Sequence, residues 1–417
     1  MRRVVLPRPK LRSLTRAIVL VAACASSAAV EASSGAEAPA PHRIAALYTA
    51  ESWRNTHGGL RAGSSYLDNL DLQIELDGER AWGIPGLRIF GYVLHNNGGT
   101  VSEDLVGDAQ AVSNIEAREH WRMYELWTDW AIGARRAASL RVGLYDLNSE
   151  FDTSEVAALF INSAHGIGTA FAQTGHNGPS IFPVTSLAAR LRWQATSTFF
   201  AQLVALDAVP GDPDHPSRNT IKLDRDEGTL WVAEVGRQAN DQRLRKIAAG
   251  AWTYTAAFDD LIRNENLPAR RHDNIGAYAL AESRVWDGAS DNDVRVDAYA
   301  RAAWANGRIN RFDKSFALGI VATGLLPARP ADRLGLALAI ARNGGHYRRT
   351  QELEGMATDA SECAVELTYR AELGEWLTVQ PSLHHVINPD TNPSRKDALA
   401  FALRFELSWE RSFSLGR

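Results

Sequence analysis

Seven polar residues around one long segment have side chains suited to binding polar solutes. Asp146, Asn148, Glu150 and Asp152 occupy alternate positions where it begins, Asn177 lies near its end, and Arg190 and Arg192 follow it. Carboxylates accept hydrogen bonds, whereas guanidinium groups offer several fixed donors. If carboxylates and guanidinium groups face each other across a pore, they form a ladder of hydrogen-bond donors and acceptors. They also set up an electric field across the pore. The same charges could also simply hold a folded segment in place.

Catalytic and metal chemistry have little support in this sequence. Two of its many carboxylates could in principle act as a glycosidase pair. However, acidic residues recur on the polar face of one predicted strand after another, as expected for a solvated lining rather than a single cleft. The neighbours His384 and His385 point to opposite faces of a strand, and no metal-ligand spacing recurs. Phosphate loops and nucleophile elbows are absent. We therefore expect no enzyme activity, no metal and no cofactor.

The first 32 residues predict a cleaved signal peptide that directs export. A cationic stretch is followed by an apolar run from Ala17 to Val30, with a small-residue cleavage site after Ala32. Competing sites exist at Ala28 and Ala29, and Cys24 lies in a possible lipoprotein site. Cleavage at Ala32 leaves Cys363 as the only cysteine, so no intramolecular disulfide is expected.

Apolar and polar residues alternate over most of the remaining chain. In the C-terminal segment, one face carries Leu399, Phe401, Leu403, Phe405, Leu407 and Trp409, and the other carries Arg404, Glu406, Ser408 and Glu410. This period of two predicts β-strands. No later apolar run approaches the ~20 residues of a membrane-spanning helix. If the chain spans a membrane, it must therefore form a closed barrel, whose backbone groups are all paired.

The expected fold is all-β, a transmembrane antiparallel β-barrel of 16 strands with inward-folded loops. About fifteen segments of suitable length occur between Leu70 and Trp409, and bacterial barrels usually have an even number of strands. We expect the missing strand near His57–Tyr66 or within Ala157–Ala172. The predicted organisation is a signal peptide (1–32), an N-terminal periplasmic segment or first strand (33–66) and the barrel (67–417).

The connections between strands differ in length, which predicts the two sides of the barrel. Short breaks suit periplasmic turns, and long ones suit extracellular loops. The short ones are Asp259–Asn266, Asn306–Arg311 and Leu373–Glu375, and the long ones are Gly98–Arg118, Phe151–Val184 and Val209–Asp226. Because the seven polar residues lie near the two ends of Phe151–Val184 or just beyond them, this segment is the predicted constriction loop.

Three stretches resemble the carbohydrate-selective porins of the OprB type. They are Val106–Ala117 with Tyr124–Trp127, Arg141–Asp152 continuing to Pro183, and Gln380–Leu383 with Asn388–Pro389. The resemblance implies a sixteen-stranded outer-membrane barrel, passive uptake of sugars and a channel narrowed by inward-folded loops. The chain departs from the usual aromatic C-terminal residue of such barrels, because it ends Ser414-Leu415-Gly416-Arg417.

These features predict a porin of the Gram-negative outer membrane through which carbohydrates diffuse passively into the periplasm. The expected partners are glucose-like mono- or oligosaccharides, outer-membrane lipid and the barrel-assembly machinery, with the protein a monomer or a homotrimer. A pI near 6.3 argues against nucleic acid. Two alternatives remain open. One is a secreted soluble all-β carbohydrate-binding protein or enzyme, and the other is a barrel for other small polar solutes.

Overall fold

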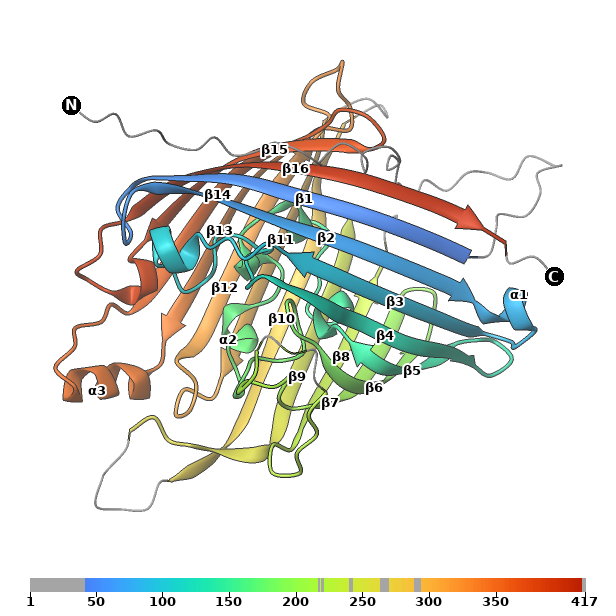
Figure 1. Cartoon of the computed structure of the whole chain (residues 1–417), viewed down its shortest axis with the longest axis horizontal. Coiled ribbons are helices and arrows are strands. Elements are labelled where there is room, and N and C mark those ends of the chain that lie inside the picture. Colours follow the sequence, from blue (N-terminus) through green and yellow to red (C-terminus); the bar gives the residue numbers. More distant parts are fainter. Residues whose placement is uncertain are drawn as a thin grey trace, which may run out of the picture.

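The chain forms a closed barrel of sixteen antiparallel strands, as the sequence predicts (Figure 1). This computed structural model describes residues 42–216, 218, 221–239, 243–262, 270–288 and 294–414, so the predicted signal peptide lies outside the described residues. Each strand pairs with its neighbours in the chain, and β16 closes the barrel on β1. The strands are β1 (His42–His57), β2 (Gly63–Asp77), β3 (Leu87–Asn96), β4 (His120–Ile132), β5 (Ala138–Tyr145), β6 (Ser186–Gln194), β7 (Phe199–Asp207), β8 (Thr229–Gln238), β9 (Leu244–Asp259), β10 (Arg271–Asp287), β11 (Arg295–Ala305), β12 (Phe312–Thr323), β13 (Arg333–Asn343), β14 (Ser361–Glu372), β15 (Leu377–Ile387) and β16 (Ala398–Phe413).

The alternation in the sequence separates the two faces of the wall. On β16, Phe401, Leu403 and Phe405 are 37–46% exposed and point outward, whereas Ala402 and Arg404 are buried inside. Apolar side chains on the outside suit contact with lipid, and the inner face is free to be polar. No helix in the described residues is long and apolar enough to cross a membrane.

The sixteenth strand is β1, which lies before the predicted place. It belongs to the segment 33–66, and β2 begins at Gly63, ahead of the predicted barrel boundary at residue 67. The prediction of a strand within Ala157–Ala172 is wrong. That stretch contains the short helical turns Ala157–Leu159 and Ser163–His165 and the helix α2 (Thr169–Ala172).

The connections at one end of the barrel are much longer than those at the other. Strand termini His42 and Phe413 lie at the end with short turns, one of which holds α1 (Gly78–Trp82). Connections 97–119, 146–185, 208–228 and 344–360 lie at the opposite end, the last containing α3 (Gly345–Leu353). By the general rule, this is the extracellular end.

Two of the predicted periplasmic turns lie at the wrong end. Asp259–Asn266, whose residues 263–266 lie outside the described residues, begins at the last residue of β9, and Asn306–Arg311 joins β11 to β12; both strand ends lie at the end with the long loops. Their position follows from parity, because successive hairpins alternate between the two ends whatever their length. Only Leu373–Glu375, between β14 and β15, lies at the end of short turns.

Candidate functional site

Two connections fold into the barrel instead of standing above it. We call residues 97–119 the first inner loop and residues 146–185 the second inner loop. The first includes the short helical turn Ser102–Val106, and the second includes Leu147–Ser149 and α2, visible inside the barrel in Figure 1. The predicted constriction segment Phe151–Val184 makes up most of the second inner loop.

Glutamates of the barrel wall hold the main chain of both inner loops. Each carboxylate accepts one or two backbone N–H groups from a loop, so it compensates donors that have no partner in a helix or sheet. The contacts are Asp152 N to Glu234 (3.0 Å), Glu155 N to Glu282 (2.9 Å), Ile161 N and Asn162 N to Glu366 (2.8 and 2.9 Å), and Ala109 N and Gln110 N to Glu362 (2.8 and 3.0 Å). The inward carboxylates of β8, β10 and β14 therefore fix the loops.

A buried ion pair fastens the second inner loop to β11. Arg301 Nε lies 2.8 Å from Asp152 Oδ1, and the two side chains are 1% and 0% exposed. The same guanidinium donates to the carbonyl oxygens of His165 (2.8 Å) and Gly166 (3.1 Å). One arginine thus joins two separate parts of the loop, at residue 152 and at residues 165–166, to the wall.

The wall beneath the loop is made of small residues. Gly319, Gly335, Ala337 and Ala339 face inward on β12 and β13. A Cβ on Gly335 would come within 2.8 Å of the Phe160 ring. The loop therefore packs closely against this part of the barrel.

The two inner loops also bind each other. Asn114 N donates to Ile161 O (2.9 Å), and Ser163 N donates to Ala111 O (3.0 Å). Because both loops are anchored to the wall and joined together, they form one unit inside the barrel.

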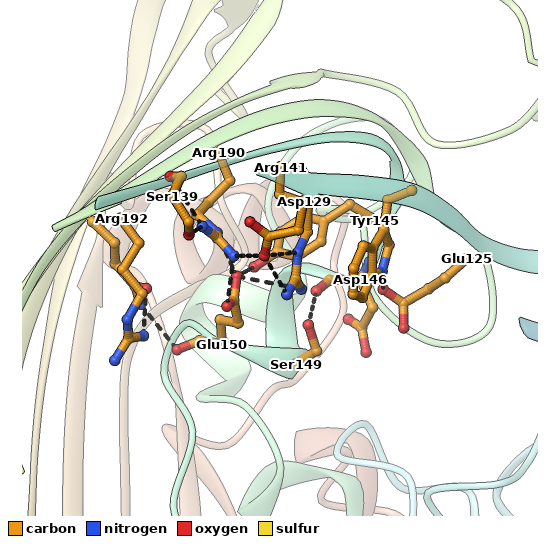
Figure 2. A network of polar contacts seen from close by, with 12 residues as sticks. Glu125, Asp129, Ser139, Arg141, Tyr145, Asp146, Ser149, Glu150, Arg190 and Arg192 are labelled. Atoms are coloured by element: carbon orange, nitrogen blue, oxygen red, sulfur yellow. Dashed lines mark hydrogen bonds and ion pairs between the residues drawn. The ribbon is translucent and has the colours of Figure 1, made fainter. Parts of the chain in front are cut away.

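A network of charges lies where the second inner loop leaves β5 (Figure 2). Arg190 of β6 contacts Glu150 (2.7 Å) and Asp129 of β4 (3.1 Å). Arg141 of β5 contacts Asp129 (3.0 Å) and Glu150 (3.6 Å). We call these four residues the charged cluster. Arg88 of β3, with a side chain 55% exposed, lies 3.8 Å from Asp129.

The charged cluster is mostly buried. The side chains of Arg190 and Asp129 are 2% and 3% exposed, while Glu150 and Arg141 keep 16% and 11% of theirs accessible. Arg141 also lies over the Trp127 ring, 3.6 Å from its centre. Burial alone would raise the pKa of Glu150, but Arg141 and Arg190 outweigh burial and hold that pKa below its usual value. Glu150 is therefore a fixed negative charge between two cations.

The other predicted site residues are placed differently. Asp146 caps the first turn of the loop through Asn148 N (2.8 Å), and Asn148 holds the carbonyl oxygens of Phe151 and Gly166. Arg192 binds Gln202 on β7 (3.0 Å). Asn177 is exposed and donates to Pro210 O (2.7 Å) in the neighbouring β7–β8 loop, so it lies apart from the cluster.

Asp129, Arg141 and Arg88 were missed by sequence reasoning. Asp129 and Arg141 occupy inward positions of β4 and β5, which alternation could have indicated. Their meeting with Arg190 depends on the pairing of three strands, with Asp129 opposite Arg141 and Arg141 opposite Arg190. In the described residues, no group of three His, Cys, Asp or Glu side chains could hold a metal ion.

Comparison with known proteins identifies the family. The model of "Carbohydrate-selective porin, OprB family" matches residues 61–409. The chain belongs to this family. It is thus an outer-membrane porin for carbohydrates, a transport channel and not an enzyme.

The OprB-family relatives are distant in sequence. Porin B of Pseudomonas aeruginosa is 21% identical over 398 residues, which cover 86% of each chain. A high-pH structure of Pseudomonas putida OprB is 20% identical with a TM-score of 0.78, covering 88% of this chain and 94% of that one. The DcaP channel of Acinetobacter baumannii is 10% identical with a TM-score of 0.52, covering 90% and 99%. At these identities the structural likeness establishes the fold.

Proposed function

We propose that glucose-like mono- and oligosaccharides cross the barrel beside the charged cluster, which acts as the selective wall of the constriction. The observation that carries this proposal is the position of Glu150. It is the first acidic side chain of the second inner loop after the cap, and its carboxylate lies between Arg190 and Arg141 with part of its surface accessible.

The chemistry of such a wall suits neutral sugars. A sugar passing through must exchange bonds to water for bonds to the channel, and these must stay weak enough to permit exit. Carboxylates accept from sugar hydroxyls, and guanidinium N–H groups donate to them. The two arginines and two carboxylates of the cluster balance each other's charge. A neutral solute therefore meets hydrogen-bond donors and acceptors without a strong net electric field. A charged solute lacks that advantage.

The remaining expectations belong to the same proposal. The leader 1–32 is removed on export, and the barrel-assembly machinery inserts the mature chain among outer-membrane lipids. The pore of this fold lies inside one chain, so a monomer suffices for transport and a homotrimer would contain three independent pores. The sugars pass without cofactor or covalent change.

Liposome swelling with glucose, a disaccharide and a charged solute of similar size tests the transport proposal. The protein should admit glucose faster than the charged solute. No swelling with folded, inserted protein would contradict an open channel, and equal rates for all solutes of one size would contradict selectivity for neutral sugars.

Two substitutions test the assignment of the constriction. Glu150→Gln should increase the preference for anions, and Arg190→Gln should increase the preference for cations, because each leaves an unbalanced charge in the cluster. The matched controls are Glu79→Gln and Arg136→Gln, which break a 2.6 Å ion pair at exposed periplasmic turns. Reversal potentials in planar bilayers measure the effect. Unchanged ion selectivity and glucose flux in both cluster variants would reject the assignment.

A further inference from the structure

One row of residues on the outer wall carries cations where lipid is expected. Trp304 of β11 lies opposite Lys314 of β12, Lys314 lies opposite Arg342 of β13, and Arg342 lies opposite Ser361 of β14. All four are at the extracellular ends of their strands. We call them the outer cationic row.

The alternation of each strand directs these side chains outward. Lys314 shares its face with Phe316, Leu318 and Ile320, which are 48–53% exposed on the outside of the barrel. Arg342 is exposed and shares its face with Leu334 and Leu336. The outer cationic row therefore stands directly above an apolar surface, at the edge of the lipid-facing belt, and none of its members faces the pore.

Lys314 and Arg342 form a like-charge pair that the described part of the chain does not neutralise. Side chains directly opposite on neighbouring antiparallel strands lie about 5 Å apart at Cβ, and like charges placed so repel. Within the described residues, neither side chain has a hydrogen bond or an ion pair. The adjacent Asp313 does not provide one, because its Cβ packs against Gly307 and its Oδ1 is buried.

An anion bound between the two cations would remove this repulsion. Two cations, an indole N–H and a serine hydroxyl supply donors of the kind that bind phosphate oxygens. Basic clusters at the edge of a membrane recognise anionic lipid headgroups in the same way. Below them, the outward Phe316 and Leu318 offer a surface for acyl chains, which a free anion in water would leave unused.

We propose that the outer cationic row binds the phosphate group of a lipid in the extracellular leaflet, with the lipid's acyl chains lying on Phe316 and Leu318. The site is separate from sugar transport, because its residues point away from the lumen. Its role is to hold a specific lipid at the β11–β14 side of the barrel.

Native mass spectrometry of the full protein in non-ionic detergent tests the proposal. The probe is diphosphorylated lipid A, with the dephosphorylated lipid as the ligand control. The variant is Lys314→Gln/Arg342→Gln. The matched control, Arg61→Gln/Lys396→Gln, removes two exposed cations from the β1–β2 and β15–β16 connections at the same end of the barrel, outside the outer cationic row.

The double variant should bind the phosphorylated lipid about thirtyfold more weakly, since each cation near a membrane surface contributes about fivefold. The control variant and the parent protein should bind alike, and the dephosphorylated lipid should bind weakly to all three. Glucose-driven liposome swelling should be unchanged in the double variant, which also shows that it folds.

Three results would overturn the proposal. The first is equal lipid binding by the double variant and the parent, and the second is an equal loss in both variants, which would indicate a general charge effect. The third is displacement of the lipid by inorganic phosphate at equal concentration, which would indicate a site for free anions. Failure of sugar transport in the parent protein would leave this lipid assay unaffected, so the two proposals can fail separately.

Discussion

Replacing Asp152 by Asn should release the second inner loop from β11. Asp152 and Arg301 are both fully buried, and their charged atoms are 2.8 Å apart. Removing one partner of such a pair leaves an unpaired buried charge and costs about 3–5 kcal/mol. The remaining bonds of Arg301 to the loop carbonyls cannot balance that charge. The opening of the loop should therefore become more frequent by a factor of about 10² to 10³ or more.

Hydrogen exchange of the segment 152–168 and single-channel conductance measure this release. Exchange should accelerate in that segment while the strands stay protected, and conductance should rise because the released loop leaves more of the lumen open.

Asp390→Asn is the control for Asp152→Asn. It breaks an ion pair with Arg311 of similar length, 2.7 Å, but with side chains 26% and 35% exposed. Such a pair is worth at most about 1 kcal/mol. Parent-like exchange and conductance in Asp152→Asn, or effects no larger than those of the control, would refute the argument that this ion pair holds the loop.

Three further predictions concern the same loops. Gly335→Leu should displace the loop at Phe160, because even a Cβ there would come within 2.8 Å of the ring; hydrogen exchange at residues 157–163 should accelerate, and unchanged exchange and conductance would contradict close packing. Burial raises the pKa of Asp146 from 3.8 to about 6, so the folded loop keeps a proton that the unfolded chain loses. Stability should therefore decrease as pH rises from about 4 to about 6, and thermal melts of Asp146→Asn should lack this slope; an identical slope in the variant would rule out Asp146 as its source. Asp260→Asn should free α3, because Asp260 accepts from His346 (2.8 Å) and His272 (3.0 Å), at a cost of about 1–3 kcal/mol. Limited proteolysis at Arg348 and Arg349 should accelerate. Cleavage at the parent rate would show that the contacts of Asp260 do not hold α3 in place.

The sequence was sufficient to predict the barrel because one face of most strands is apolar. It placed the outward residues of β16 correctly. It left segment 33–66, which contains β1, undecided between a periplasmic segment and a first strand, and the reason is physical. The outward positions of that strand include Tyr48, Ser52, Arg54 and Thr56, so polar residues occur on both faces and the period of two is hidden.

The interior was harder to predict, because its contacts join residues far apart in the chain. The pairing of Asp152 with Arg301 and of Glu366 with Ile161 depends on how the second inner loop crosses the lumen. Alternation indicates that Glu366 points inward but not what it binds. The length of a single connection is likewise no guide to the side on which it lies, as the short turn Asn306–Arg311 demonstrates.

The way in which the wall glutamates hold the inner loops has a consequence for how such channels diversify. Glu234, Glu282, Glu362 and Glu366 bind peptide N–H groups, which every residue except proline provides. A substitution in the loop can therefore alter the side chain offered to a passing solute and leave these attachments intact. The same barrel can therefore hold inner loops of different sequence. New selectivities can be engineered by substituting loop residues whose side chains do not contact the wall.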